Sequence, residues 1–292
     1  GAMDTGYTVE LWMGPAASNI GTQESGTDGT VELMQANIDL RISGVDLKIG
    51  QFGTIVGNEV YNYNENAFYT HSWGFAIEPT HHTGILASYT VSDDLQIAGG
   101  LANSTAPAIN AKGANAENKT VLASVSYTLP SGTGALAGTE LYYAYVSGAD
   151  SNTSSEDNTD YHYSSIALPE LVANLTTKVV WDHVEHAGTT GYAGVNSDVV
   201  GLYLGYSLND TTNLNVRYES GNVNTHAGAA SATASTIGGT NMDNLQSLTV
   251  GVNHKIWDNV ISRIEYRHDE VDTASGTDGS QEVVALNLIY TF

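Results

Sequence analysis

Along most of this chain, large apolar side chains alternate with polar or small ones, with a period of two residues. The last nine residues, from Val284 to Phe292, follow this pattern from end to end. A period of two is that of a β-strand whose two faces meet different surroundings. No stretch holds apolar residues at helical spacing over more than three turns, so the pattern predicts an all-β fold.

Turn-forming residues divide the alternating stretches into fourteen predicted strands. Short and long connections follow one another in turn, as in an up-and-down sheet with hairpins at one end and long loops at the other. Pro169 interrupts the alternation and predicts a turn between the eighth and ninth strands. The predicted strands cover residues 5–13, 30–42, 45–52, 83–91, 95–103, 119–129, 139–148, 159–168, 173–186, 196–208, 213–221, 243–256, 260–270 and 280–292.

Three hairpins test the register of these strands, because paired residues share a face across the turn. The proposed turns are Ser43-Gly44, Ser92-Asp93-Asp94 and Trp257-Asp258-Asn259. Each turn places apolar residues opposite apolar residues. The predicted pairs are Ile42 with Val45, Leu40 with Leu47, Val91 with Leu95, Tyr89 with Ile97, Ile256 with Val260, and Val252 with Ile264.

The opposite face of the strands carries charge. Across the Ser43-Gly44 turn, the register pairs Arg41 with Asp46 and Asp39 with Lys48. Such a face is either the solvated side of a soluble sheet or the wall of a water-filled barrel. We favour the barrel, because soluble sandwiches seldom repeat turns so regularly. The residues predicted to line the pore are Asp39, Arg41, Asp46, Lys48, Lys178, Asp182, Arg217, Glu219, Lys255, Arg263, Glu265, Arg267 and Asp269.

The composition excludes several classes of protein. No stretch approaches the roughly 18 to 20 uninterrupted apolar residues that a membrane-spanning helix needs, whereas a membrane barrel needs lipid-facing residues on only one face of each strand. A net charge of -23, with nine Lys and Arg, argues against a nucleic-acid-binding protein. The absence of cysteine leaves no disulfide framework and no thiolate metal site.

The two ends of the chain carry different signals. Gly1-Ala2-Met3 matches a tag-cleavage scar, so we predict a single barrel domain over residues 4–292. The last strand resembles the closing strand of bacterial outer-membrane β-barrels, in which a terminal aromatic is part of the signal read by the insertion machinery. That resemblance assigns the insertion signal to Tyr290 and Phe292.

Residues from about 30 to 148 resemble the OmpL-like β-barrel porins, a family of outer-membrane barrels. The matching stretches read VDLKIGQFGTIVGNE at 45–59, YNYNENAF from 61, and EPTHHTGILASYTVSDDLQIAGGLANS at 78–104. Where the family usually has Ser-x-Ser after the Asn-rich loop, this chain has Thr70-His71-Ser72. Family members are longer at the N-terminus, so the resemblance allows sixteen strands in an intact barrel.

The resemblance implies a transmembrane antiparallel up-and-down β-barrel in the bacterial outer membrane. Its implied partners are outer-membrane lipid and lipopolysaccharide, the barrel-insertion machinery and small hydrophilic solutes, with an oligomer as one option. Aromatic side chains that parity places outward are predicted to lie at the lipid headgroups. These are Trp12, Tyr89, Tyr127, Trp181, Tyr206, Tyr266 and Tyr290.

The longest predicted connection, residues 53–82, is either an external cap or an inward fold that narrows the pore. We favour the inward fold, because Glu59 and the Asn-rich stretch can hydrogen-bond to basic residues of the wall. The candidate constriction residues are Glu59, Tyr61, Tyr63, Glu65 and Trp73.

Three clusters have the residue types of metal or catalytic sites. His71, Glu78 and His81-His82 resemble a metal site, but neighbouring histidines on a strand point to opposite faces, which favours polar contacts at the strand end. The cluster Asp182-His183-Glu185-His186 has the residue types of a catalytic site, but alternation points Asp182 and His186 inward and His183 and Glu185 outward. No nucleophile is positioned beside them. The acidic loop 150–160 lacks the spacing of an EF-hand, so a solvated loop is favoured over a weak Ca²⁺ or Mg²⁺ site. We therefore predict no catalytic group, cofactor or resident metal.

These observations predict a passive diffusion channel for small hydrophilic solutes. Acidic long loops should give a weak cation preference that salt screens. The alternative from a different class is a non-conducting structural or adhesive barrel whose interior is plugged.

Overall fold

The computed structural model of the chain describes residues 4–14, 17, 31–105, 119–149, 158–186, 195–224, 241–273 and 278–292. Within them the chain forms the fourteen predicted strands, with bounds that agree to within a few residues. The strands are β1 (Asp4–Met13), β2 (Val31–Ile42), β3 (Val45–Gly53), β4 (His81–Ser92), β5 (Leu95–Ala102), β6 (Thr120–Thr128), β7 (Glu140–Ala149), β8 (Asn158–Leu168), β9 (Leu175–His186), β10 (Val195–Asn209), β11 (Thr212–Asn224), β12 (Asn241–Trp257), β13 (Val260–Thr273) and β14 (Gly279–Tyr290).

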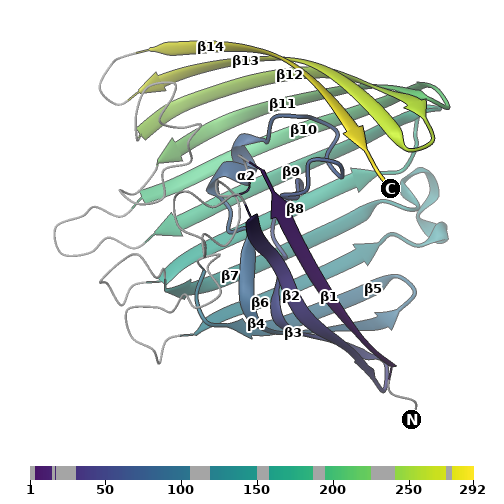
Figure 1. The fold of residues 1–292 in the computed structure, drawn as a ribbon, viewed down its shortest axis with the longest axis vertical. Helices are drawn as coiled ribbons and strands as arrows, with labels where there is room; N and C mark the ends of the chain where they lie inside the picture. The colour runs from purple at the N-terminus through teal and green to yellow at the C-terminus, as the bar shows by residue number, and fades with distance from the viewer. Residues whose placement is uncertain are drawn as a thin grey trace.

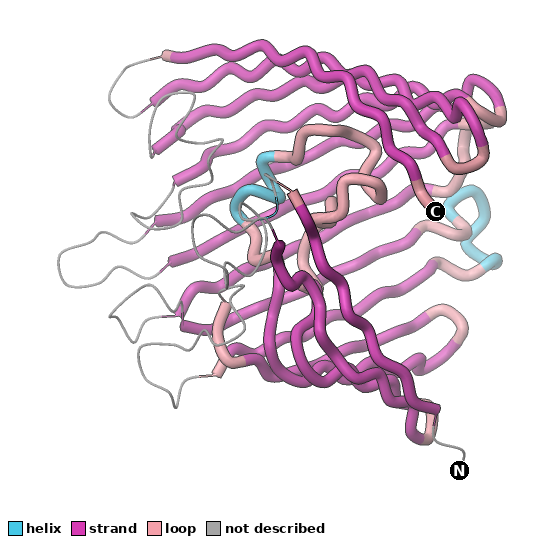
Figure 2. Tube along the Cα trace, viewed as in Figure 1, coloured by secondary structure: helices cyan, strands magenta, loops and turns pink. Residues whose placement is uncertain are grey.

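All fourteen strands belong to one antiparallel sheet in which each strand pairs with its neighbours along the chain. The sheet curls around an interior, with β1 to β3 crossing in front of it in Figures 1 and 2. The predicted all-β, up-and-down arrangement is confirmed. Within the described residues, β1 pairs with β2 and β14 pairs with β13, and no β1–β14 pairing closes the sheet. The described part of the chain holds no helix whose length and apolar character would let it cross a membrane.

The β2–β3 hairpin has the predicted register, with Ile42 opposite Val45 and Leu40 opposite Leu47. Its turn residues both have positive φ, 53° at Ser43 and 86° at Gly44. Two positive φ angles are typical of a type I′ turn, whose twist matches that of the strands it joins. Here the turn residues and the apolar pattern specify the same register.

The β4–β5 and β12–β13 hairpins correct two of the predicted pairs. Tyr89 pairs with Ile97 and Val252 pairs with Ile264, as predicted. Nearest the turns the prediction is wrong, because Ser92 faces Leu95 in place of Val91, and Trp257 faces Val260 in place of Ile256. A β-bulge in β4 and another in β12 each absorb one residue, which shortens the predicted three-residue turns to two.

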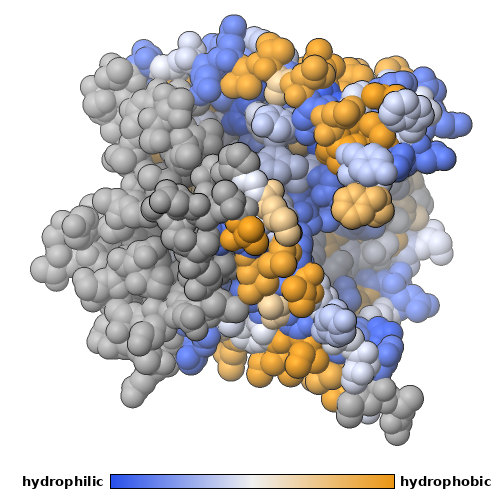
Figure 3. Space-filling view, in the orientation of Figure 1, coloured by the Kyte–Doolittle hydropathy of each residue, from blue (hydrophilic) through white to orange (hydrophobic). Residues whose placement is uncertain are grey.

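The outer face of the sheet is apolar and exposed. On β14 the exposed fractions of Val284, Leu286 and Leu288 are 74%, 79% and 65%. Figure 3 shows apolar side chains gathered over the strands at both edges of the sheet. An exposed apolar face of this extent requires an apolar environment, because water would disfavour it at about 25 cal/mol per Å².

Trp12 is the exception among the aromatic residues predicted to face outward. Its ring lies 5.6 Å from that of Tyr61 and 6.0 Å from that of Tyr63, on the inside of the sheet. Trp12 shares this face with Glu10, whereas Val9 and Leu11 are exposed on the outer face of β1. The prediction that Trp12 faces lipid is therefore wrong.

The inner face is not uniformly polar. Two buried apolar clusters lie on it, and both contain residues of the segment between β3 and β4, Val56 in the first and Trp73 in the second. Alternation identifies the inner face but cannot show which of its positions the segment covers. The other members of the clusters are Phe52, Leu86, Ala102, Leu122, Ala144, Val146, Tyr163 and Val180, and Val199, Val223, Met242, Leu245 and Val271.

Candidate functional site

Residues 54–80 leave the sheet after β3 and fold into its interior, where Figures 1 and 2 show them surrounded by strands. We call this segment the inner loop. It contains α2 (Trp73–Ile77), a short helix whose N-cap Ser72 accepts a hydrogen bond from the backbone N–H of Phe75 at 3.0 Å. Because α2 contacts β9, β10 and β11, the inner loop crosses the lumen and does not merely cover its mouth.

Arg217 on β11 is the centre of a charged contact between the wall and the inner loop. Its Nη1 donates to Glu59 Oε1 at 2.6 Å and to the carbonyl oxygen of Thr70 at 2.9 Å, and its Nε lies 3.1 Å from Glu219 Oε2. The guanidinium also stands 4.8 Å from the centre of the Phe68 ring. Arg217 is 0% exposed, so its charge is directed at the inner loop and not at open water.

Glu59 stays ionised in this buried contact. Burial, the largest single effect, would raise the pKa of its carboxyl, and the Arg217 guanidinium is the largest of several effects that together outweigh it. His71, whose Nδ1 lies 3.4 Å from Glu59 Oε2, and the Ser72 N–H, which donates to the same oxygen at 2.7 Å, act in the same direction. Together these groups lower the pKa of Glu59 to about 2.

The charged row on β13 also faces the inner loop. Arg263 donates to the carbonyl oxygen of Tyr63. Two residues further along the strand, Glu265 Oε2 accepts the backbone N–H of Tyr69 at 2.6 Å, and its Oε1 accepts the hydroxyl of Thr70. These wall residues bind backbone groups of the loop that have no strand partner, which is how buried backbone is kept hydrogen-bonded.

The same row continues with Arg267 and Asp269. Arg267 Nη1 donates to the carbonyl oxygen of His71 at 2.6 Å, while its Nε donates to Asp269 at 2.9 Å. Asp269 also accepts the indole N–H of Trp73 at 3.0 Å, and Glu219 accepts the Trp73 backbone N–H at 2.7 Å. Trp73 is therefore held by two wall carboxylates and is 0% exposed.

The first half of the inner loop is fastened to the opposite side of the sheet. The Tyr61 hydroxyl donates to Glu10 Oε2 on β1 at 2.5 Å and accepts from Gln35 Nε2 on β2 at 2.7 Å. On β7, the Tyr142 hydroxyl donates to the carbonyl oxygen of Ile55 at 2.5 Å. The inner loop is thus held from both sides of the sheet.

The two remaining candidate constriction residues, Glu65 and Tyr63, also have contacts within the inner loop. Glu65 accepts from the Asn62 side chain at 3.0 Å. The Tyr63 ring stacks on Tyr69 at 5.9 Å and lies 4.9 Å from His71.

Both predicted wall pairs, and a third pair that the predicted wall residue Lys255 forms with a turn residue, lie away from the inner loop. They are exposed and lie near short turns, where water screens them. They are Asp39 with Lys48 at 2.9 Å, Arg41 with Asp46 at 2.6 Å, and Lys255 with Asp258 at 3.0 Å.

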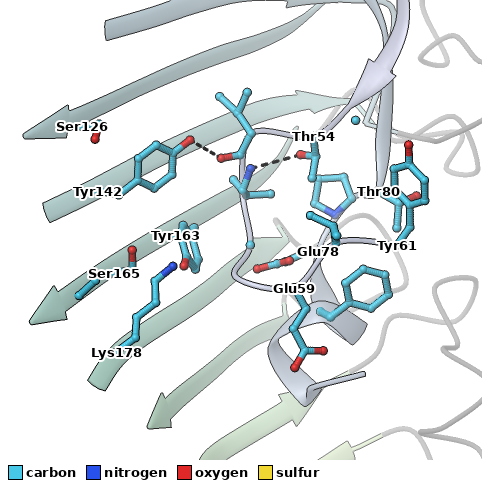
Figure 4. A pocket seen from close by; sticks show the side chains of 18 of the residues that line it. Thr54, Glu59, Tyr61, Glu78, Thr80, Ser126, Tyr142, Tyr163, Ser165 and Lys178 are labelled. Carbon is cyan, nitrogen blue, oxygen red and sulfur yellow. Dashed lines mark hydrogen bonds between the residues drawn. The ribbon is translucent and has the colours of Figure 1, made fainter. Parts of the chain in front are cut away.

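Open space remains beside the inner loop. A cavity of about 480 Å³ lies between its residues 54–60 and 78–80 and the wall formed by β6 to β9, and a second of about 350 Å³ lies on the side of Phe68. Glu140, Ala167 and Lys178 line both cavities. In Figure 4, Lys178 and Tyr163 reach from the wall into the space that faces Glu78. The buried Tyr163 hydroxyl has no hydrogen-bond partner in the described structure.

The remaining candidate clusters are separated by the fold. His82 Nε2 lies 2.9 Å from Thr54 Oγ1, and the His81 ring packs 4.4 Å from Tyr61. His183 Nδ1 lies 2.8 Å from Asp198, whereas Asp182 faces Gly74 of α2. Among the described residues no group of three His, Asp or Glu side chains could hold a metal. Residues 150–157 of the acidic loop lie outside the described residues.

Several residues of this site were not predicted. Glu10 and Gln35 hold Tyr61, and Tyr142 holds Ile55. Inward parity was the available signal for all three, but a polar residue on an inner face does not show which loop atom it will meet.

The comparisons with known proteins agree with this architecture. A model of the family "Putative beta-barrel porin-2, OmpL-like" matches residues 2–292. The outer membrane channel DcaP of Acinetobacter baumannii has a similar structure, with a TM-score of 0.67 at 11% identity over 100% of this chain and 82% of DcaP.

Two further solved proteins have a similar fold. The trimer form of OmpT of Vibrio cholerae has a TM-score of 0.58 at 14% identity, over 89% of this chain and 80% of OmpT. OpdK of Pseudomonas aeruginosa, solved with vanillate, has a TM-score of 0.58 at 12% identity, over 100% of this chain and 79% of OpdK. No curated protein sequence matches. The family match over nearly the whole length shows that this chain belongs to the OmpL-like β-barrel porins of the bacterial outer membrane.

Proposed function

We propose that this porin is a passive diffusion channel for small hydrophilic solutes. The observation that supports it most is the pair of cavities beside the inner loop, which share Glu140, Ala167 and Lys178. Together the two cavities would give solutes a hydrated path beside the loop along β6 to β10. Exclusion by size would follow from the inner loop, which makes Glu59, Tyr61, Tyr63, Glu65 and Trp73 constriction residues.

Charge selection along this path should rest on few residues. The charges of Arg217, Arg263 and Arg267 are directed at the inner loop, so a solute would not meet them. Lys178 and Glu140 line the open space and carry opposite charges. With the chain at a net charge of -23, we propose a weak cation preference that falls as salt screens the field.

Planar-bilayer recording of the purified porin tests this proposal. We expect steady single-channel openings, and a zero-current potential in a salt gradient that has the sign for cations and shrinks at high salt. Clear anion selectivity would contradict the proposed cation preference but not the proposal that the porin is a diffusion channel.

The second candidate is a non-conducting structural or adhesive barrel. The two apolar clusters between the inner loop and the wall favour it, because they fill part of the lumen with close-packed side chains. Persistent electrical silence of folded protein would support this candidate. We propose no enzymatic activity, since the chain belongs to a family of porins and resembles channels.

We further propose that the barrel is inserted by the barrel-insertion machinery through Tyr290 and Phe292, in contact with lipid and lipopolysaccharide. OmpT, which has a similar fold, has a trimer form, and we propose a trimer here as well. The mass of the detergent-extracted porin tests this, and a monomeric mass would contradict it.

A further inference from the structure

Two carboxyl groups meet where the end of the inner loop lies against β9. Glu78 follows α2 directly, and its carboxyl interacts with that of Asp182, against which Gly74 of the same helix packs. Glu78 Oε1 and Asp182 Oδ1 are shut off from solvent, and neither has a hydrogen-bond partner in the described structure. In Figure 4, Glu78 points from the loop toward the wall.

The backbone around the pair is shaped to receive it. A Cβ atom added at Gly57 would overlap the Glu78 carboxyl, and one added at Gly74 would overlap the Asp182 carboxyl. Gly57 also has a φ of 102°, which residues with a side chain rarely adopt. Each carboxyl group therefore lies directly against the backbone of a glycine, in the space that a Cβ atom would occupy.

The basic groups nearby are engaged elsewhere. Arg217 on β11 lies against Glu59 at 2.6 Å and Glu219 at 3.1 Å. These two carboxylates add negative charge beside the pair. Lys178 of β9 lines the same cavity as Glu78 but forms no ion pair within 4.0 Å among the described residues.

The remaining titratable groups that face the pair are phenols. Tyr163 on β8 lines the cavity with Glu78. Tyr203 on β10 lies 3.4 Å from Glu59 through its hydroxyl. Neither phenol can neutralise a second carboxylate, because an uncharged hydroxyl carries no positive charge.

Two buried carboxyl groups in contact can satisfy these oxygens through a mutual hydrogen bond only if one group holds a proton, since two carboxylates have only acceptors. We propose that Glu78 and Asp182 share one proton, that this proton fastens the end of the inner loop to β9, and that its loss releases the loop end and widens the path. The proposal rests on the proposed channel function for its effect on conductance.

The direction of the pH response follows from the surroundings. Burial, and after it the charge of Asp182, raises the pKa of the Glu78 carboxyl well above its ordinary value of 4.5. A raised pKa means that the docked loop binds the proton more tightly than the released loop does. Docking of the loop end is therefore strongest at a pH below the ordinary Glu78 pKa of 4.5. It weakens as the pH rises through the raised pKa that Glu78 has in the docked loop.

Single-channel recording between about pH 5 and about pH 10 tests this inference. We expect the wild-type conductance to step upward on the alkaline side. In Glu78→Gln the amide N–H donates to Asp182 without titrating, so the step should be lost and the low conductance kept. Glu140→Gln removes another acid from the same cavity and should retain the step. An alkaline step that persists in Glu78→Gln, or is absent from the conducting wild type, would overturn the proposal.

Infrared spectroscopy follows the proton without relying on conduction. At neutral pH the wild-type porin should show the absorption of a protonated, buried carboxylic acid, and Glu78→Gln should lose it. Identical spectra in this region would refute the shared proton, even if the channel conducts. A porin that shows this absorption but never conducts would contradict the proposed channel function, while the shared proton between Glu78 and Asp182 would be supported.

Discussion

Replacing Arg217 by Gln should release the inner loop from the wall. The substitution leaves Glu59 and Glu219 buried without their guanidinium partner, which lies 2.6 and 3.1 Å from them. The hydrogen bond to the carbonyl oxygen of Thr70 and the contact with Phe68 are lost as well. The bond from Arg217 Nη2 to Thr249 Oγ1 on β12, at 3.1 Å, is lost too, so the damage falls on the contact between the loop and strands β11 and β12.

The pKa of Glu59 sets the magnitude. A carboxyl whose pKa falls from 4.5 to about 2 on docking stabilises the docked loop by about 3 kcal/mol at neutral pH. Breaking a buried ion pair typically costs about 3 to 5 kcal/mol, which agrees. A loss of about 3 kcal/mol lowers the ratio of docked to released loop about 150-fold.

Single-channel recording measures this ratio directly. Arg217→Gln should show larger conductance and frequent transitions between levels, whereas the wild type should remain at one level. Arg41→Gln is the matched control, because Arg41 forms an exposed pair with Asp46 worth about 0 to 1 kcal/mol. If Arg217→Gln conducts like the wild type and like Arg41→Gln, the argument that Arg217 anchors the inner loop is wrong.

Three further predictions concern selectivity, acid and assembly. Lys178→Glu should move the zero-current potential toward stronger cation preference, because Lys178 is the basic residue that lines both cavities; an unchanged potential would place the path elsewhere. Acidification should loosen the inner loop, because the contribution of Glu59 is complete above its ordinary pKa of 4.5 and is lost as pH falls through about 2; recordings that stay quiet down to about pH 2 would contradict this. Removal of Phe292 should slow assembly into outer membranes, measured by the heat-modifiable band on gels, whereas Phe292→Tyr should assemble normally; equal rates for all three would discount the insertion signal.

The strands were predictable from the sequence because each of their residues meets one of two environments. Leu286 and Leu288 are exposed on the outer face while Asn287 between them is half-buried on the inner face, so alternation alone fixes strand and face. The Arg41–Asp46 pair was also accessible, because a tight turn brings residues five apart into register. Local rules were sufficient for these features.

The loop contacts were not accessible in this way. Glu59 and Arg217 are 158 residues apart, and parity shows only that Arg217 points inward. From alternation alone, the basic residues of β11 and β13 are expected to face water. Instead the inner loop covers them, and its polar groups bind them. The Glu78–Asp182 pair was not predicted for the same reason, since nothing in the sequence around either residue indicates the other.

The central claim is that the inner loop lies against the wall while the channel conducts. A Cβ atom at Gly74 would lie 3.7 Å from the Cβ of Asp182, which suits a disulfide, and the chain has no other cysteine. Single-channel recording of the Gly74→Cys, Asp182→Cys porin should show steady conductance after oxidation has locked the loop to β9. Failure to cross-link, or a cross-linked channel that is silent, would contradict the account.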